Sequence, residues 1–333
     1  MAASFCLHSM KREDFIEKNF PDIRAPFSVG IELTPYCNMR CIHCYGQNMR
    51  SSKVMTAAEI KRIIDILCEN GMISVSFTGG EIFTRNDFEE IYIYAKEKGL
   101  IVSLLTNLTL LNEQHIEMFK EYPVSIISTT MYGYHEDVYE SVTGIKGSYK
   151  KFIYAIELLK KNNILFELKY IAMRQNIQDL YDFRKYCKDL GVNSLVSFSI
   201  FPTTDNDNKP LEYRVTPEEV FDFDMNDEDR KRFFDQLAYE YYERSVGKRD
   251  KKVIDRQEAF YLYNCNISFR ETFINSSGMM QGCVRTSYDT YDLLNGDFAE
   301  GWDYLNRQFR QKKSSKGFKC NKCDCTSIIQ YVN

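Results

Sequence analysis

The segment Pro35–Tyr45 (PYCNMRCIHCY) directly follows the apolar run Val29–Leu33 and is the most informative stretch of this chain. Its cysteines have the spacing Cys-x3-Cys-x2-Cys. Three thiolates on one loop can hold three irons of a cubane iron–sulfur cluster, which leaves the fourth iron open to a substrate or cofactor. A zinc ion is the alternative, with His43 as its fourth ligand, although a tetrahedral site is cramped because His43 lies between Cys41 and Cys44.

Outward from this loop, residues 28–201 alternate short apolar runs with helical periodicity. The runs are rich in Val, Ile, Leu and Ser, which is typical of strands covered on both faces. Strands that alternate with helices predict right-handed βαβ units and a parallel sheet. Six units are fewer than the eight of a closed TIM barrel, so we expect an α/β fold with a partial, open (β/α)6 barrel. The expected strands are Val29–Leu33, Ser74–Thr78, Ile101–Thr106, Val124–Thr130, Leu165–Ile171 and Ser194–Ile200.

Helical signals lie between these runs. Thr56-Ala-Ala-Glu59 is a capping box, apolar residues then recur at helical spacing up to Leu67, and Gly71 suits a left-handed helix end. Beyond the last strand, Thr216–Glu219 predicts another helix start, with proline at its first position. The other expected helices run from Asn86 to Gly99, Asn112 to Lys120, Ser148 to Asn162, Ile177 to Asp189 and Asn226 to about Ser245.

A change in composition divides the chain. From about Leu262 the sequence is short-stranded and turn-rich, and it carries five cysteines. We therefore expect an N-terminal extension (1–27), the barrel (28–205), a helical bridging region (206–260) and a small cysteine-rich domain (261–333).

The composition excludes several classes of protein. The 333 residues include 23 Tyr and 23 Phe, enough for a substantial core, which excludes disorder and a fibrous repeat. A net charge of −4 argues against general nucleic-acid binding, and 11 cysteines are too sparse for a disulfide scaffold. No apolar run is long enough to span a membrane, and Met1–Arg12 lacks a secretory signal. We expect a cytoplasmic protein whose thiols stay reduced.

A second motif, Thr78-Gly79-Gly80-Glu81, ends the second expected strand. Two glycines allow a ligand to approach the backbone closely, and Glu81 adds a carboxylate. Alone, this motif is better explained as an ordinary turn. Enzymatic barrels keep their chemistry at the C-terminal ends of the strands, so the cysteine loop and the glycines should meet there.

Together, the cysteine loop and this motif resemble the signature of the radical S-adenosylmethionine (SAM) superfamily. The resemblance implies a 4Fe–4S cluster on Cys37, Cys41 and Cys44, with SAM bound to the open iron. One electron from the cluster then cleaves SAM to a 5′-deoxyadenosyl radical, which abstracts hydrogen from the substrate. His43 takes the place of a residue that is usually aromatic and packs near the adenine of SAM.

The same resemblance implies further SAM contacts at the ends of the strands. Thr78, Gly79, Gly80 and Glu81 match the motif that binds the SAM amino group. Asn107 lies in a recurrent family segment in which a usual glycine is replaced by Leu108, and Thr130 matches a hydroxyl residue that helps to bind SAM. Lys169 could meet the SAM carboxylate, although Asn107 and Lys169 are equally compatible with ordinary polar residues at strand ends. The segment Thr143–Ser148 resembles a structural loop before the family's fourth helix.

A second cysteine cluster lies near the C-terminus. Cys265 and Cys283 precede the segment Cys320-Asn-Lys-Cys323-Asp-Cys325, and four thiolates make a full site for zinc or an iron–sulfur cluster. The spacing resembles the auxiliary-cluster module of radical SAM enzymes, in its short "twitch" form rather than the longer SPASM form. It implies one auxiliary 4Fe–4S cluster with an electron-transfer or structural role. The implied ligands are Cys265, Cys283, Cys320 and Cys323.

The remaining cysteines have no such pattern. Cys325 could replace Cys323, donate a hydrogen atom or have no role. Cys6, Cys68 and Cys187 are isolated, and the last two lie on expected helices as core residues.

The resemblance favours an enzyme that modifies a ribosomally synthesised peptide by a crosslink, a thioether, an epimerisation or an oxidation. A dehydrogenase or rearrangement enzyme for a small metabolite is the alternative, and a non-enzymatic zinc-binding interaction protein lies outside the enzyme class. Expected partners are the peptide or small-molecule substrate and a reducing protein such as flavodoxin or ferredoxin. The stretch before Ser28 is short for a peptide-recognition domain, so we expect a peptide either to bind the barrel mouth and residues 203–245 or to use a separate recognition protein.

Overall fold

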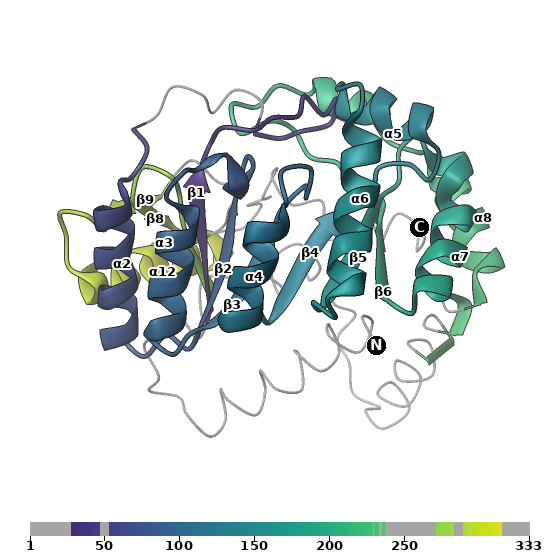
Figure 1. The fold of residues 1–333 in the computed structure, drawn as a ribbon. Helices are drawn as coiled ribbons and strands as arrows, with labels where there is room; N and C mark the ends of the chain where they lie inside the picture. Colours follow the sequence, from purple (N-terminus) through teal and green to yellow (C-terminus); the bar gives the residue numbers. More distant parts are fainter. Residues whose placement is uncertain are drawn as a thin grey trace.

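The computed structural model describes residues 28–46, 53–228, 230–232, 235–236, 271–282 and 289–314. These residues form a nine-stranded sheet with the strand order β6-β5-β4-β3-β2-β1-β7-β8-β9 (Figure 1). The strands β1 to β6 are parallel, each paired with the next in the chain, as expected of a partial (β/α)6 barrel. Their bounds are β1 Ser28–Thr34, β2 Ser74–Gly79, β3 Ile101–Leu105, β4 Ile126–Thr130, β5 Phe166–Ile171 and β6 Asn193–Ser197.

Helices connect these strands and cover one face of the sheet (Figure 1). The predicted capping box begins α2: the Thr56 hydroxyl accepts a hydrogen bond from the Glu59 N–H at 3.2 Å, and the Glu59 carboxylate accepts one from the Thr56 N–H at 2.8 Å. A second capping box, at Thr216 and Glu219, confirms the helix start predicted there. The helices are α2 Ala57–Glu69, α3 Phe88–Glu97, α4 Glu113–Glu121, α5 Glu136–Thr143, α6 Ser148–Lys161, α7 Leu180–Leu190 and α8 Pro217–Asn226, with short 3-10 turns at Ile82–Thr84, Ile177–Asp179 and Lys209–Tyr213.

The helix α5 has no counterpart among the sequence predictions. It is short, and the residue that precedes it, His135, makes no side-chain cap, so the usual start signal is missing. Asp179 replaces that cap, because its carboxylate accepts hydrogen bonds from the backbone N–H groups of Tyr134 and His135 at 2.8 and 3.0 Å. A tertiary contact therefore begins this helix.

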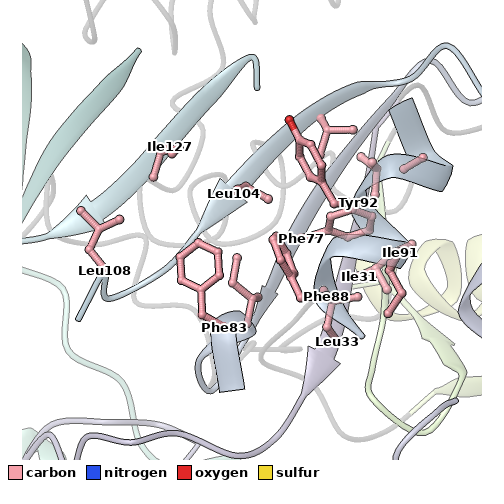
Figure 2. Close-up of a cluster of buried hydrophobic side chains, with 14 of the residues drawn as sticks. Ile31, Leu33, Phe77, Phe83, Phe88, Ile91, Tyr92, Leu104, Leu108 and Ile127 are labelled. Atoms are coloured by element: carbon pink, nitrogen blue, oxygen red, sulfur yellow. The ribbon is translucent and has the colours of Figure 1, made fainter. Parts of the chain in front are cut away.

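Alternation along the strands gives the sheet two different faces. Every second residue packs under the helices, as Ile31, Phe77, Leu104 and Ile127 do in the cluster of Figure 2. The intervening residues point to the opposite face; those of β2 and β5 are half-buried, and Glu32 on β1 and Ser128 on β4 are buried. Strands buried on one face and partly open on the other suit a barrel that surrounds a substrate.

The described C-terminal part adds to the same sheet. The strand β7 (Glu271–Ile274) runs parallel to β1, and β8 (Met279–Gln281) and β9 (Thr290–Asp292) continue it in antiparallel fashion. The N–H of Ser276, in the β7–β8 turn, donates to the Glu32 carboxylate at 2.8 Å, and its carbonyl accepts from the Met55 N–H at 2.8 Å. These contacts hold the β7–β8 turn against the barrel.

One expectation for this part is wrong: residues 298–314 form a long helix, α12 (Phe298–Ser314), and not short strands and turns. Gly301 inside the helix weakens the helical signal of the sequence. Packing explains the glycine, because a Cβ atom there would lie 2.7 Å from the Met280 Cε atom and would also overlap the ring of Tyr291.

The prediction of a helix from Asn226 to about Ser245 is met where the structure describes it, at residues 228, 230–232 and 235–236, and the rest lies outside the described residues. Among the helices of the described part, none is long and apolar enough to cross a membrane.

Candidate active site

The cysteine loop follows the C-terminal end of β1 and rests on the end of α5. The Arg40 N–H donates to the Thr143 carbonyl at 2.9 Å, and the Ile42 N–H donates to the Val142 carbonyl at 3.0 Å. Gly144, with φ of 70°, ends α5 where a Cβ atom would lie 3.0 Å from the Arg40 carbonyl oxygen. The start of the segment Thr143–Ser148, which resembles a structural loop of the family, therefore packs against the cysteine loop and supports it.

The three thiols of the loop lie close enough to influence one another. Burial, followed by the neighbouring thiols of Cys44 and Cys37, raises the pKa of Cys41 far above its usual range. Burial also raises the pKa of Cys37. These groups are therefore protonated in the metal-free protein, and a cluster that binds them must displace their protons.

The glycine motif at the end of β2 fits against this loop. The Gly80 N–H donates to the Thr34 carbonyl and the Glu81 N–H to the Tyr36 carbonyl, both at 2.8 Å. A Cβ atom at Gly80 would overlap the Tyr36 carbonyl and lie 2.9 Å from the Cys37 nitrogen. The end of β1 and the cysteine loop thus pack directly against Gly79 and Gly80, and the contact of these glycines with SAM stays a prediction.

Glu81 is fully buried and serves the loop that follows β3. Its Oε1 accepts from the Thr106 hydroxyl at 2.7 Å and from the Phe83 N–H at 3.1 Å, and its Oε2 accepts from the Asn107 N–H at 2.6 Å. Burial raises the pKa of Glu81, and these hydrogen bonds oppose the rise. The side chain therefore holds the β3 loop in place, and its contact with SAM stays a prediction.

Asn107 joins the β3 loop to the cysteine loop. Its Nδ2 lies 2.9 Å from the Asn38 Oδ1 and 3.7 Å from the Cys37 Sγ. The Asn38 amide in turn donates to the Thr109 hydroxyl at 2.8 Å. Residues 38, 107 and 109 thus form a closed set of hydrogen bonds beside Cys37.

Leu108 marks a departure from the family pattern that the structure explains. Its φ of 64° lies in the left-handed region that favours glycine, at a cost of about 1–2 kcal/mol for a leucine. The side chain is fully buried in the core (Figure 2), and burial of a leucine stabilises by about 1.5–3 kcal/mol. The apolar contact offsets the backbone strain.

His43 is buried and packs its ring 5.1 Å from that of Tyr132. Burial lowers the pKa of His43 to about 4, so the ring is neutral, and its Nδ1 finds no hydrogen-bond partner among the residues that the structure describes. Within the described residues, no three His, Cys, Asp or Glu side chains are gathered so as to hold one metal ion. A zinc ion needs ligands that converge on one point, whereas a cubane cluster binds each thiolate at a separate iron. The donor set of the loop therefore fits the cluster better.

Tyr132 is a candidate site residue that the sequence analysis did not single out. Tyr132 influences the pKa of Cys41, its ring packs against that of His43, and burial raises its own pKa well above the usual range. The sequence signal was its place two residues beyond Thr130 at the end of β4.

The remaining predicted SAM contacts lie on neighbouring strands. Thr78 is half-buried on β2, and Thr130 pairs with Lys169 across β4 and β5. The Lys169 ammonium lies 3.8 Å from the Glu167 carboxylate, and burial lowers its pKa. The structure therefore turns Lys169 toward Glu167, and its contact with SAM stays a prediction.

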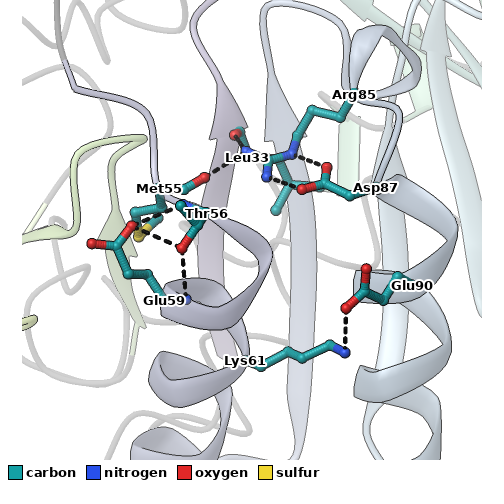
Figure 3. Close-up of polar contacts among 8 residues, drawn as sticks. All are labelled: Leu33, Met55, Thr56, Glu59, Lys61, Arg85, Asp87 and Glu90. Carbon is teal, nitrogen blue, oxygen red and sulfur yellow. Dashed lines mark hydrogen bonds and ion pairs between the residues drawn. The ribbon is translucent and has the colours of Figure 1, made fainter.

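Arg85 is a second residue absent from the predictions, and it positions the start of the cysteine loop (Figure 3). Its guanidinium donates to the Leu33 carbonyl at 2.7 Å, to the Met55 carbonyl at 2.9 Å, and to both Asp87 oxygens at 2.7 Å. One side chain thus joins the end of β1, the approach to α2 and the start of α3.

We expect Arg85→Ala to lower the free energy of unfolding by about 3 kcal/mol, because it leaves two buried carbonyl groups without donors. Lys61→Ala is the matched control, since the Lys61–Glu90 ion pair in the same view is exposed and contributes less than about 1 kcal/mol. Chemical denaturation measures both variants. Equal losses would contradict the positioning role of Arg85.

The cysteines of the second cluster lie outside the described residues, as does Cys6. They are Cys265, Cys283, Cys320, Cys323 and Cys325. The two isolated cysteines on helices contribute to the core, as predicted. Cys187 is buried, and Cys68 is partly buried and packs against the hydrophobic core.

Comparisons with known proteins agree with this geometry. Residues 31–187 match the Radical SAM superfamily. An AdoMet-dependent heme synthase of Methanosarcina barkeri is 25% identical over 315 residues, which cover 91% of this chain and 90% of that protein. The antilisterial bacteriocin subtilosin biosynthesis protein AlbA of Bacillus subtilis is 30% identical over 171 residues, covering 51% of this chain and 38% of AlbA.

The fold has a counterpart among solved structures. Streptococcus suis SuiB, bound to the precursor peptide SuiA, superposes with a TM-score of 0.66 at 13% identity and covers 93% of this chain and 71% of its own. At that identity the likeness shows the fold: a parallel partial barrel with a small C-terminal antiparallel region. The sequence match implies a 4Fe–4S cluster and SAM as cofactors, and it supports a radical SAM enzyme, with residues 31–187 as the part that matches the superfamily.

Proposed function

We propose that this enzyme modifies a ribosomally synthesised peptide, using a cluster held by Cys37, Cys41 and Cys44. When bound, the cluster supplies the electron for reductive cleavage of SAM. The chain contributes the loop that carries the thiols, the backbone of Gly79 and Gly80 against that loop, and a barrel face that receives the substrate. AlbA, which acts in biosynthesis of the bacteriocin subtilosin, and SuiB, with its bound precursor peptide, support a peptide substrate.

The lining of the sheet face opposite the helices carries this proposal. Ser76 lies opposite Ser103 across β2 and β3, and Ser128 lies opposite Glu167 across β4 and β5. The Ser128 hydroxyl donates to the Glu167 carboxylate at 2.6 Å, with Lys169 beside it. Such hydroxyl and charged groups match the amides and polar side chains of a peptide, whereas the face of a porphyrin ring requires an apolar slot.

A heme precursor is the second candidate substrate, and one observation favours it. The heme synthase relative aligns with 91% of this chain, including the C-terminal part, whereas AlbA aligns with about half of it. This candidate belongs to the small-metabolite alternative.

Measuring SAM cleavage in the presence of each candidate substrate distinguishes a peptide from a heme precursor. We expect the reconstituted, dithionite-reduced enzyme to change the mass of a precursor peptide encoded beside its gene, with release of 5′-deoxyadenosine, and to leave iron coproporphyrin III unchanged. Turnover of the porphyrin without any peptide product would reverse the assignment.

Glu167→Gln should weaken peptide turnover by about tenfold or more, because loss of a charged hydrogen-bond partner costs about 1.5–3 kcal/mol.

We also propose that Cys265, Cys283, Cys320 and Cys323 hold one auxiliary 4Fe–4S cluster. The spacing supports this assignment, and so does the attachment of the β7–β8 turn to the barrel through Ser276, which brings this part of the chain to β1.

The iron content of anaerobically reconstituted protein tests this second cluster. We expect about eight irons per chain, and about four in Cys283→Ala, because each cubane holds four. Cys6→Ala is the control and should keep all eight. Four irons in the unaltered protein, or stoichiometric zinc, would contradict the auxiliary cluster.

A further inference from the structure

The amide of Asn107 lies directly beside a sulfur atom of the cysteine loop. Its Nδ2 is 3.7 Å from the Cys37 Sγ, and a second donor, the Met39 N–H, is 3.3 Å from the same sulfur. The Cys37 thiol itself points toward the Asn38 Oδ1 at 4.0 Å. Once Cys37 is a thiolate it has no proton to donate, and its sulfur then serves only as an acceptor for these neighbours.

The orientation of this amide is fixed by its other contacts. Its Oδ1 accepts from the Thr109 N–H at 3.0 Å and from the Thr109 hydroxyl at 2.7 Å, and its second N–H donates to the Asn38 Oδ1. A rotated amide would place its NH2 group against the Thr109 N–H and its oxygen against the Asn38 oxygen. Two mismatched pairs exclude that arrangement, so an N–H group faces Cys37.

These contacts use the whole hydrogen-bonding capacity of the side chain. An amide has two N–H donors and two acceptor positions, and all four are engaged by residues 37, 38 and 109. The backbone N–H of Asn107 is bound to Glu81 as well. In this arrangement the Asn107 side chain is fully engaged by the protein, and its nearest cluster ligand is Cys37.

We propose that Asn107 is a positioning residue whose N–H group hydrogen-bonds to the Cys37 thiolate and raises the reduction potential of the cluster on this loop. Reduction adds one electron, supplied by a protein such as flavodoxin or ferredoxin, with no bond broken and no proton moved. The added negative charge spreads onto the ligand sulfurs, where an N–H donor stabilises it. The inference rests on the proposed function only in taking Cys37 as a cluster ligand.

A redox titration followed by electron paramagnetic resonance tests the proposal. The signal that changes when SAM is added identifies the cluster with an open iron. For Asn107→Leu, we expect the reduced-to-oxidised ratio of this cluster at a fixed ambient potential to fall about tenfold, which corresponds to about 59 mV for one electron. Its iron content should remain that of the unaltered protein, because the three thiol ligands are intact.

Two further variants keep the test decisive. Thr109→Val removes a hydroxyl that orients Asn107 but leaves the N–H donor, so its shift should be clearly smaller than that of Asn107→Leu. Asn107→Asp keeps the shape of the side chain, replaces the donor with an oxygen, and should lower the potential even where the leucine variant fails to fold.

The outcomes are distinct. A full cluster with an unchanged potential in both Asn107 variants would overturn the proposal, as would equal shifts in Asn107→Leu and Thr109→Val. Absence of any SAM-responsive cluster in the unaltered protein would refute the proposed ligand set itself, a result recognisable before any variant is made.

Discussion

Replacing Cys41 with alanine should abolish the cleavage of SAM to 5′-deoxyadenosine under dithionite. Cys41 is the central thiol of the loop, and its pKa is raised first by burial and then by both neighbouring thiols. Loss of a hydrogen-bonding partner of a metal ligand typically costs 10–100-fold in affinity or activity, and loss of the ligand itself should exceed about 100-fold. Chromatography of the nucleoside product measures the effect.

Cys68→Ser is the matched control for this experiment. Cys68 is a partly buried cysteine on α2 that packs at the edge of the core, away from the loop. Its replacement should leave both the brown colour of the anaerobic protein and SAM cleavage intact. Cleavage that persists in Cys41→Ala would show that the cluster is held elsewhere, whereas cleavage lost in both variants would point to general damage by cysteine replacement.

The second large effect is expected from Gly80→Ala. A Cβ atom there would lie 2.5 Å from the Tyr36 carbonyl carbon and 2.9 Å from the Cys37 nitrogen, both backbone atoms that cannot rotate away. Either β2 or the cysteine loop must move, and overpacking of this kind costs about 3 kcal/mol or more. We therefore expect a lower free energy of unfolding together with loss of bound iron.

Gly99→Ala separates steric overlap from backbone strain. Gly99 has a φ of 80° but nothing within 4 Å of an added Cβ atom, so its replacement should cost about 1–2 kcal/mol and leave the iron content unchanged. If Gly80→Ala retained full iron and lost no more stability than Gly99→Ala, the tight fit between β2 and the loop would be wrong.

The barrel was predictable because its signals are local. Capping boxes at Thr56 and Thr216, helix-ending glycines such as Gly191, and apolar runs of strand length each report on a few adjacent residues. The helix α5 was not predictable, because the carboxylate that begins it, Asp179, comes from a distant part of the chain. The same holds for Gly301, whose role depends on Tyr291 and Met280.

The candidate site also has a part that local sequence predicts and a part that depends on distant contacts. The spacing of Cys37, Cys41 and Cys44 identified the loop, but the partners of these thiols required the fold. The fold shows that the Glu81 carboxylate accepts from the Asn107 N–H and that the Asn107 amide lies beside Cys37, while the contacts of both residues with SAM stay predictions. Sequence patterns indicate which residues matter to a site more readily than which atom each one touches.

The position of β1 inside the sheet has a consequence for how the protein is made. Its partner β7 follows late in the chain, and Ser276 and Glu32, which join the two, are 244 residues apart. At 5–20 residues per second, a ribosome needs roughly 12–50 s to cover that distance. During that interval the nascent chain has one edge of β1 unpaired, next to the cysteine loop, and unpaired strand edges favour aggregation. Chaperone supply during synthesis should therefore raise the yield of this enzyme more than changes to its mature surface.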